Sequence, residues 1–232
     1  MTESKTYLST MGFHESFMLR LLARTNASKE DELVIVVPRP VVGGVADAIE
    51  GLRATCYRMR YPEPKVEEIE VGDFPKTLSQ VAMIVGRSKG FVYTNLSLGL
   101  RLMDTVILLS LISTRRPFVA YFFNETGEGS EVVVRGEEVY SLLEDYTAED
   151  MRLLMTVGKG EGVALSDLAK GLGKSEKTVV NRVSELKKRG LLNLRGKDRG
   201  VELTELGRAL LVVKLGGEYK KPGGSPGGEG KG

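Results

Sequence analysis

The sequence is poor in the residues that build disulfides and metal sites, because it has one cysteine and one histidine among 232 residues. Cys56 alone excludes an intramolecular disulfide and a cysteine-based metal cluster, and we predict that it is a small buried thiol. The N-terminus lacks a basic flank followed by an apolar run, so no signal peptide is predicted. The most apolar segment, residues 106–112, is far shorter than the roughly 20 residues of a membrane span. We therefore predict a buried helix there, in a cytoplasmic protein without a metal or cofactor.

The net charge of +2 is small but unevenly spread. Residues 1–143 carry a net charge of −2, whereas residues 144–221 carry +4. Within residues 174–200, nine Lys and Arg stand against three Asp and Glu. Such a local concentration of positive charge is typical of a protein that binds the phosphate backbone of nucleic acid.

Strand-like and helix-like patterns alternate over the first 135 residues. Strands are predicted at 6–11, 32–37, 66–71, 90–95 and 118–123, and helices at 14–24, 43–59, 75–87 and 100–114. The apolar, β-branched and aromatic strands suit a sheet that is covered on both faces, and each connection is long enough for a parallel crossover. We therefore predict an α/β fold with a doubly wound, mostly parallel, Rossmann-like sheet, to which residues 131–135 add an antiparallel edge strand.

A smaller domain is predicted after a connecting helix at 136–146. Its expected order is a helix, a short helix, a turn that contains glycine, a third helix, a basic hairpin at 191–203 and a last helix to about residue 215. Four hydroxyl residues are predicted to cap these helices: Thr147, Ser166, Ser175 and Thr204. This order is typical of a winged helix-turn-helix. The predicted domains are a Rossmann-like α/β domain (1–135), a linker helix (136–146), a DNA-binding domain (147–215) and a disordered tail rich in Gly and Pro (216–232).

The third helix of the second domain is the predicted recognition helix for double-stranded DNA. Val179, Val183 and Leu186 are expected to face inward, which leaves polar residues on the outer face near its N-terminus. Lys187, Lys188 and Arg189 are expected at phosphates. The predicted DNA-binding residues are Ser175, Lys177, Thr178, Asn181, Arg182, Lys188, Lys197 and Arg199, the last two at the tip of the hairpin. The alternatives are an ordinary solvated face or a module that binds protein.

Ligands of open α/β sheets bind beyond the carboxyl ends of the strands, which directs attention to the loops there. After the first strand, Gly12 would let a phosphate approach the backbone at the start of a helix. This loop lacks the G-x-G-x-x-G pattern, and Arg39 stands where a dinucleotide site would need an acidic residue, so a nicotinamide cofactor is disfavoured. His14 could touch a phosphate or a base, although we favour a residue without chemistry.

The fourth predicted strand ends in a polar run, Asn95-Leu96-Ser97-Leu98-Gly99-Leu100-Arg101. Asn95 could bond a base or a ribose, Ser97 could cap the next helix, and Arg101 could face a phosphate. The alternative is that Ser97 only caps the helix and that Arg101 pairs with Asp104.

Residues 10–15, the strand 33–38 with Pro40, and the pattern Asn95-x-Ser97-x-x-x-Arg101 resemble the CRISPR-associated Rossmann fold, or CARF domain. With the C-terminal winged helix, the chain resembles the archaeal CRISPR-associated transcriptional regulators of type I-A systems. The resemblance implies that residues 1–135 sense a ligand and dimerise, and that the DNA is a promoter or a CRISPR leader. The resemblance implies a homodimer that binds a cyclic oligoadenylate, with cyclic tetra-adenylate as the natural expectation, across its two-fold axis. The expected ligand-binding residues are Thr10, Met11, Gly12, Phe13, His14, Pro38, Arg39, Asn95, Leu96, Ser97 and Arg101.

The leading hypothesis is therefore a regulator of CRISPR-Cas genes that is not an enzyme and whose affinity for DNA depends on the ring. Some CARF proteins cleave their ring with the help of a basic residue, so a slow ring nuclease is the second hypothesis. The third is an architectural protein in which the first domain only dimerises.

Overall fold

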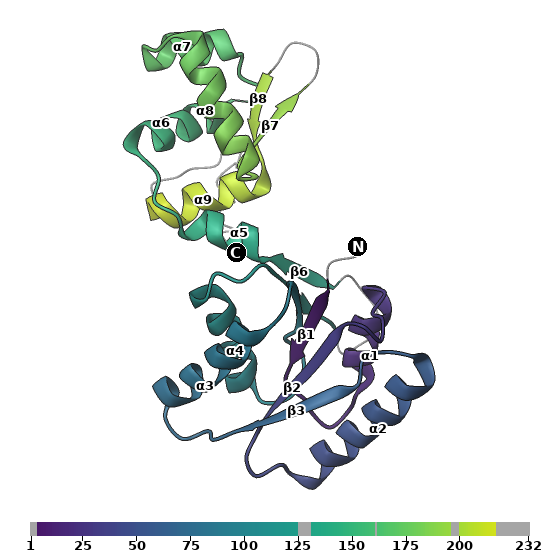
Figure 1. Ribbon diagram of the computed structural model, residues 1–232. Coiled ribbons are helices and arrows are strands. Elements are labelled where there is room, and N and C mark those ends of the chain that lie inside the picture. The colour runs from purple at the N-terminus through teal and green to yellow at the C-terminus, as the bar shows by residue number, and fades with distance from the viewer. Residues whose placement is uncertain (1–3, 125–130, 161, 196–199, 217–232) are drawn as a thin grey trace, which may run out of the picture. The chain divides into compact units, whose positions relative to one another are not determined.

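The computed structural model describes residues 4–124, 131–160, 162–195 and 200–216 (Figure 1). The chain divides into two compact units, Met1–Val139 and Tyr140–Gly232. Their boundary falls inside the segment 136–146 that the sequence predicts as a connecting helix. The predictions for Lys197 and Arg199, and for the tail from residue 217, lie outside the described residues.

The first unit is built on a six-stranded sheet with the strand order β3-β2-β1-β4-β5-β6. Strands β1 to β5 run parallel, and β6 pairs antiparallel with β5. The strands are β1 (Lys5–Ser9), β2 (Glu32–Pro38), β3 (Pro64–Ile69), β4 (Phe91–Asn95), β5 (Phe118–Phe122) and β6 (Val132–Arg135). The predicted Rossmann-like sheet is confirmed, with its edge strand.

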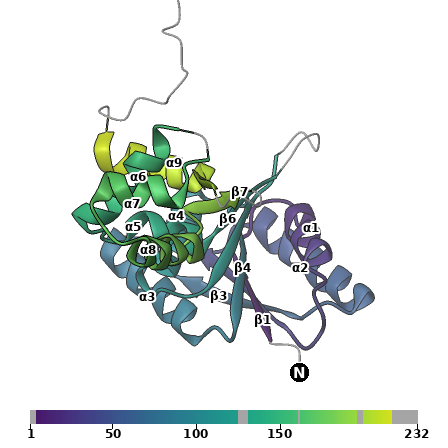
Figure 2. The ribbon, with the colours of Figure 1, turned by 90° about the horizontal axis from the view of Figure 1, so that it is seen from above.

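Helices cover both faces of this sheet, α1 and α2 on one side and α3 and α4 on the other (Figure 2). They are α1 (Ser16–Arg24), α2 (Gly43–Met59), α3 (Phe74–Arg87) and α4 (Arg101–Ser113). Helix α4 contains the apolar segment predicted to be buried, and Val106, Ile107 and Leu111 are fully buried at helical spacing. No helix among the described residues is both long and apolar enough to cross a membrane.

Some predicted boundaries differ from the structure by two residues. β1 pairs with β2 only as far as Ser9, so it ends before Thr10 and Met11, which were predicted as strand. Helix α1 begins at Ser16 instead of residue 14. The loop between β1 and α1 is therefore longer than predicted, and it holds the whole of the first candidate motif.

The second unit has the predicted winged-helix order of elements. After α5 (Gly136–Leu143), which spans the boundary between the units, come α6 (Ala148–Gly158), α7 (Leu165–Leu172), α8 (Glu176–Lys188), β7 (Leu192–Arg195), β8 (Gly200–Leu203) and α9 (Glu205–Leu215). Three predicted caps are confirmed, because the Thr147, Ser175 and Thr204 hydroxyls accept from main-chain N–H groups of α6, α8 and α9. The Ser166 cap is wrong, because α7 begins at Leu165 and its N-cap is Ala164, two residues before the predicted one.

The core of the second unit is one cluster of buried apolar side chains from the four helices α6, α7, α8 and α9 and from the β7–β8 hairpin. Val179, Val183 and Leu186 of α8 are at most 2% exposed and belong to this cluster, as the helical spacing predicts. The opposite face of α8 is left to solvent. The fold thus presents the side of α8 that the sequence predicts to be polar.

Candidate functional sites: a cavity and an exposed helix

A cavity of about 810 Å³ opens at the carboxyl ends of β1, β2 and β4 in the first unit. The strand order reverses between β1 and β4, and ligands of open α/β sheets bind at such a reversal. The lining residues are Met11, Gly12, Phe13, His14, Ser16, Phe17, Pro38, Val42, Val45, Ser97, Leu98, Gly99 and Leu100. Six of the eleven residues predicted for the ligand are among them: Met11, Gly12, Phe13, His14, Pro38 and Ser97.

Two glycines bring the loops after β1 and β4 into main-chain contact at this cavity. A Cβ atom on Gly12 would lie 2.9 Å from the backbone nitrogen of Gly99, and one on Gly99 would lie 2.7 Å from the carbonyl oxygen of Met11. Gly99 also has φ +70°, a conformation that other residues adopt only with strain. This wall of the cavity is therefore formed by backbone, which any other residue would push apart.

Three helices begin at the cavity without a side-chain cap. Ser16 is the first residue of α1, while Val42 and Leu100 are the N-cap residues of α2 and α4, and all three line the cavity. In the described part of the chain no side chain accepts a capping hydrogen bond at these three N-termini. Uncapped N-termini leave main-chain N–H groups available and carry the positive end of the helix dipole. The cavity therefore favours an anionic ligand.

The side chains of the cavity are otherwise largely apolar and aromatic. Phe13, which lines the cavity, is 68% exposed. Its ring lies against Gly44 of α2, where an added Cβ would be 2.8 Å from the ring. Phe17 stacks on Phe123, with ring centroids 6.0 Å apart. Of the residues described as lining the cavity, His14 is the one with a titratable side chain. Exposed aromatic rings of this kind can stack on the bases of a nucleotide.

In the fourth-strand motif, Asn95 and Ser97 form hydrogen bonds within the first unit, and the predicted cap of α4 by Ser97 is wrong. Asn95 is fully buried: its N–H donates to Ser9 Oγ at 2.8 Å, and its Oδ1 accepts from the N–H of Ser97 at 2.9 Å. Ser97 Oγ accepts from the N–H of Phe123 at 2.7 Å and does not cap α4. These short polar side chains hold the loop that forms the cavity wall. Thr10 and Leu96, also predicted at the ligand, are buried beside them.

The two predicted arginines do not line the cavity. Arg39 Nε pairs with Glu68 Oε2 at 3.2 Å, across β2 and β3. Arg101 is exposed at the start of α4, and the described residues include no ion pair between Arg101 and Asp104, so the predicted pairing of these two is wrong. Burial raises the pKa of the Asp104 carboxyl to about 7. The positive potential of the cavity thus comes from main-chain dipoles.

Sequence reasoning missed seven of the lining residues: Ser16, Phe17, Val42, Val45, Leu98, Gly99 and Leu100. One signal was available, because the pair Gly43-Gly44 at the start of α2 is poor in helix propensity and suits a place where something approaches the backbone. The apolar members gave no such signal, since their types are equally common in a core.

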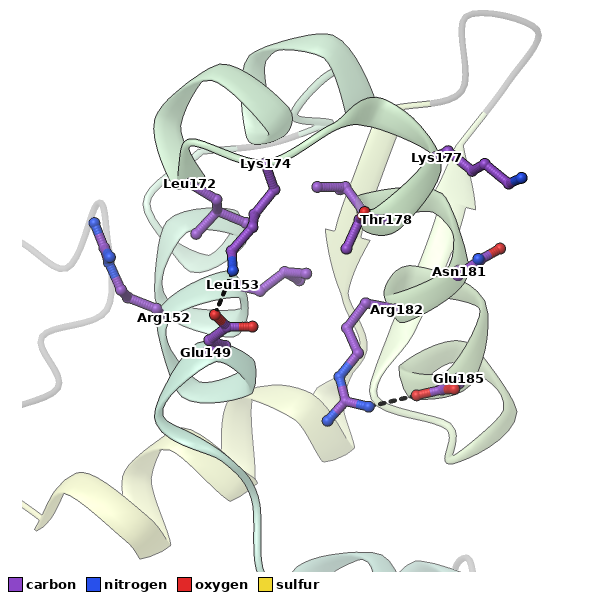
Figure 3. Close-up of a pocket in the computed structure, with 11 residues that line it drawn as sticks. Glu149, Arg152, Leu153, Leu172, Lys174, Lys177, Thr178, Asn181, Arg182 and Glu185 are labelled. Carbon is purple, nitrogen blue, oxygen red and sulfur yellow. Dashed lines mark hydrogen bonds and ion pairs between the residues drawn. The ribbon is translucent and has the colours of Figure 1, made fainter.

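Helix α8 carries the predicted DNA-binding face of the second unit. Ser175, Lys177, Thr178, Asn181 and Lys188 are exposed, and Figure 3 shows Lys177 and Asn181 pointing away from α6. Ser175 Oγ and Thr178 Oγ1 lie 2.8 Å apart and close the N-terminal turn. Lys177 and Asn181 therefore form the accessible polar surface near the N-terminal end of α8, which is the part that reaches base edges in a helix-turn-helix.

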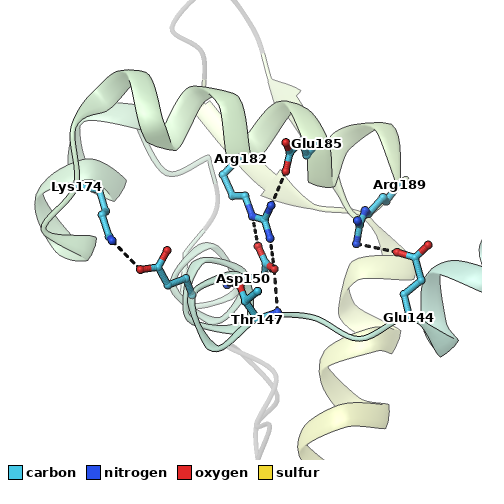
Figure 4. Close-up of polar contacts among 8 residues, drawn as sticks. Glu144, Thr147, Asp150, Lys174, Arg182, Glu185 and Arg189 are labelled. Atoms are coloured by element: carbon cyan, nitrogen blue, oxygen red, sulfur yellow. Dashed lines mark hydrogen bonds and ion pairs between the residues drawn. The ribbon is translucent and has the colours of Figure 1, made fainter.

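Arg182 is a correction to the predicted base-reading set. Its guanidinium pairs with Asp150 of α6 (Figure 4). Its Nη1 contacts Glu185 Oε2 at 2.5 Å (Figure 3). Arg182 and Glu185 line a groove of about 390 Å³ between α6 and α8. Arg189, expected at a phosphate, pairs with Glu144 Oε2 at 2.7 Å. Both arginines are thus engaged within the second unit.

The ion pair with Arg182 and the bonds from Thr147 lower the pKa of the Asp150 carboxyl group. Asp150 is 1% exposed, and burial alone would raise its pKa. Hydrogen bonds from Arg182 and from Thr147 outweigh that effect and hold the pKa of Asp150 below its ordinary value. The buried group is therefore a carboxylate with its partners in place.

Comparison with known proteins supports both halves of the fold. The family model of the Csa3 CRISPR-associated Rossmann-like domain matches residues 5–135. Csa3 of Saccharolobus solfataricus, a CRISPR locus-related protein whose name describes DNA binding, is 45% identical over 211 residues, which cover 91% of this chain and 88% of that protein.

Two solved structures are similar to parts of the chain. The S. aureus MepR–DNA complex is 24% identical with a TM-score of 0.29, over 34% of this chain and 71% of the other. Csm6 of Enterococcus italicus, bound to cyclic hexa-2'-fluoro-hexa-dAMP, is 9% identical with a TM-score of 0.46, over 81% of this chain and 55% of the other. On the strength of the matched domain and of the relative with 45% identity, this chain belongs to the Csa3 family of CRISPR-associated proteins with a Rossmann-like domain.

Proposed function

We propose that this protein is a DNA-binding regulator of CRISPR-Cas genes whose first unit senses a cyclic oligoadenylate. The observation that carries the sensing half is the cavity at β1, β2 and β4, because three uncapped helix N-termini and two phenylalanines line it. Main-chain N–H groups suit phosphates, and aromatic rings suit adenines. A cavity of about 810 Å³ is also within the usual range of small-molecule sites.

The proposed ligand is cyclic tetra-adenylate, bound across a homodimer. A ring of four identical nucleotides has two-fold symmetry, so each of two subunits can offer the same loops to half of it. One subunit then needs to bind only two phosphates. In the described part of the chain no lysine or arginine lines the cavity, so the main-chain N–H groups at the helix N-termini would bind these phosphates.

The DNA-binding half of the proposal rests on α8. Its exposed Lys177, Thr178 and Asn181 lie at the end of a helix-turn-helix that reaches base edges, and Lys188 is exposed at the other end. The Saccharolobus relative, whose name describes DNA binding, supports the same assignment because it covers almost the whole chain.

Calorimetric titration of the full-length protein with cyclic tetra-adenylate tests the sensing half. We expect one ring per two chains, and Phe13→Ala should weaken binding about tenfold or more, since stacking of one base on an aromatic ring contributes roughly 1–3 kcal/mol. Tyr57→Ala is the matched control, because Tyr57 is an 89% exposed aromatic residue on α2 that does not line the cavity.

Absence of binding to rings of four or six adenylates would remove the sensing proposal and leave a dimerisation role for the first unit. If the ring is instead recovered as a linear product, with the loss of that product in Arg101→Ala, the protein is a ring nuclease.

A further inference from the structure

The segment 140–150, which begins the second unit, is bonded to the C-terminal end of α8. Arg189, the C-cap residue of α8, pairs with Glu144 at 2.7 Å, and its guanidinium lies 5.4 Å from the ring centroid of Tyr146. Ser141 Oγ donates to the carbonyl of Arg189 at 3.0 Å, and Tyr146 Oη donates to the carbonyl of Ser141 at 2.6 Å. The segment therefore bonds both the side chain and the main chain of Arg189.

The same segment holds the middle of α8 through Asp150 (Figure 4). The Asp150 carboxylate accepts two hydrogen bonds from Arg182, one from the N–H of Thr147 at 3.0 Å and one from its Oγ1 at 2.7 Å. The bond from the N–H of Thr147 is one half of the capping box of α6, whose other half runs from the N–H of Asp150 to Thr147 Oγ1. Because Asp150 is buried, loss of Arg182 would leave a carboxylate with an incomplete set of partners, which is costly.

The two attachments lie seven residues apart on α8, which places them about two turns apart on the same side of the helix. The rest of the contact between α8 and its unit is apolar packing by Val179, Val183 and Leu186. Apolar packing is non-directional, whereas two ion pairs at fixed heights specify how far α8 is shifted along its axis and how it is rotated. That position decides where Lys177 and Asn181 point.

The segment also follows the first unit directly in the chain. Helix α5 runs from Gly136 to Leu143, and the boundary between the units falls within it, after Val139. A change in the first unit that moves the end of its chain therefore acts first on the residues that hold α8.

We propose that segment 140–150 positions the recognition helix and transmits the state of the first unit to it, with Arg182 and Arg189 as positioning residues that do not contact DNA. The transmission part rests on the proposed function, since it needs a ligand that alters DNA binding. The positioning part requires only that α8 binds DNA.

The sign of two substitutions separates positioning from simple electrostatics. Glu144→Gln and Asp150→Asn each remove a negative charge beside α8, so electrostatics alone predicts tighter binding to DNA. Loss of positioning predicts weaker binding. The slope of log Kd against log salt gives a second criterion, because a lost phosphate contact lowers that slope by about 1, whereas a misplaced helix need not change it.

The probe is a fluorescent duplex of about three helical turns, selected from a random pool by the wild-type protein. We expect about fivefold weaker binding for Glu144→Gln, about tenfold for Asp150→Asn and for Arg182→Gln, and an unchanged salt slope for all three. Glu205→Gln is the matched control, because it breaks the Arg208–Glu205 pair of α9, which does not involve α8. Stoichiometric titration measures the folded fraction of each variant. If Asp150→Asn does not fold, Glu144→Gln still tests the positioning role.

Binding that is unchanged or tighter in Glu144→Gln would overturn the positioning role, and so would a slope lowered by about 1 in Arg182→Gln. The transmission role is tested by the ratio of DNA Kd values with and without cyclic tetra-adenylate. We expect Glu144→Gln to bring this ratio closer to 1 while the ring binds unchanged. A Kd ratio in Glu144→Gln equal to that of the wild type would overturn the transmission role. A ratio of 1 in the wild type would overturn the proposed control by the ligand, and the positioning role would then be decided by the affinities and salt slopes alone.

Discussion

The cavity of the first unit and the exposed face of α8 present positive potential in different forms. Around the cavity it comes from the N-termini of α1, α2 and α4, whereas on α8 it comes from charged lysine side chains. Main-chain dipoles are fixed by the fold and act over a short range, while lysines on a surface move freely and act through salt-screened fields. The first arrangement suits one ligand of defined shape, and the second suits a long polyanion. Substitutions can test this contrast.

The largest effect is expected where the cavity wall is backbone. Gly99→Ala places a Cβ 2.7 Å from the Met11 carbonyl oxygen in a left-handed conformation, which should cost roughly 1–3 kcal/mol of unfolding free energy and abolish ring binding. Thermal unfolding and calorimetry measure the two effects. Gly86→Ala is the matched control, because a Cβ there meets nothing within 4 Å and lies in helix α3. Equal behaviour of the two variants would show that contact between the two loops is not needed.

On α8, by contrast, single side chains should separate affinity from specificity. Asn181→Ala should weaken binding to a selected duplex by about tenfold and leave binding to random duplexes unchanged, because a bidentate base contact contributes roughly 1–3 kcal/mol. Lys177→Ala should weaken binding to all duplexes if it holds a phosphate, and should lower the salt slope by about 1. Competition assays at several salt concentrations distinguish these results. Identical losses on both duplexes in both variants would contradict the assignment of Asn181 to a base.

The last prediction concerns stability alone and the partly buried carboxyl of Asp104 in α4. Asp104 has a pKa raised to about 7 by burial, so the folded state favours its neutral form. The stability that this gives is complete below the unfolded pKa of about 4 and is lost as pH rises toward 7. Asp104→Asn should therefore gain roughly 1–3 kcal/mol relative to wild type between pH 4 and pH 8 in denaturant unfolding.

The exposed Asp47 of α2 provides the control for that experiment, and we expect Asp47→Asn to follow the wild type across the same pH range. A constant difference between Asp104→Asn and wild type at every pH would show that Asp104 does not titrate in this range.

The periodic parts of the fold could be predicted from the sequence because their signals are local. Helix α2 has its predicted bounds, and the caps at Thr147, Ser175 and Thr204 depend only on residues three positions away. The loop after β1 was harder, since its strand ends where pairing with β2 stops, and pairing is a tertiary property.

The errors at the two sites share a physical cause. Arg182 lies three residues after Val179 and four before Leu186, so it borders the buried face of α8, and its partner Asp150 is 32 residues away in the chain. Asn95 has a side chain that can serve a ligand or hold a turn equally well, and burial decides between these roles. The hydroxyl of Ser97 bonds to Phe123, which is 26 residues away in the chain, instead of capping α4. Residue type and spacing cannot reveal a distant partner or a buried environment.

The most direct test of the whole account is the affinity of the full-length protein for a selected DNA duplex, measured with and without saturating cyclic tetra-adenylate. We expect the ring to change the Kd by about fivefold or more, in either direction, which corresponds to a coupling of about 1–3 kcal/mol. A Kd that stays the same while calorimetry shows the ring bound would contradict the claim that the first unit controls the recognition helix.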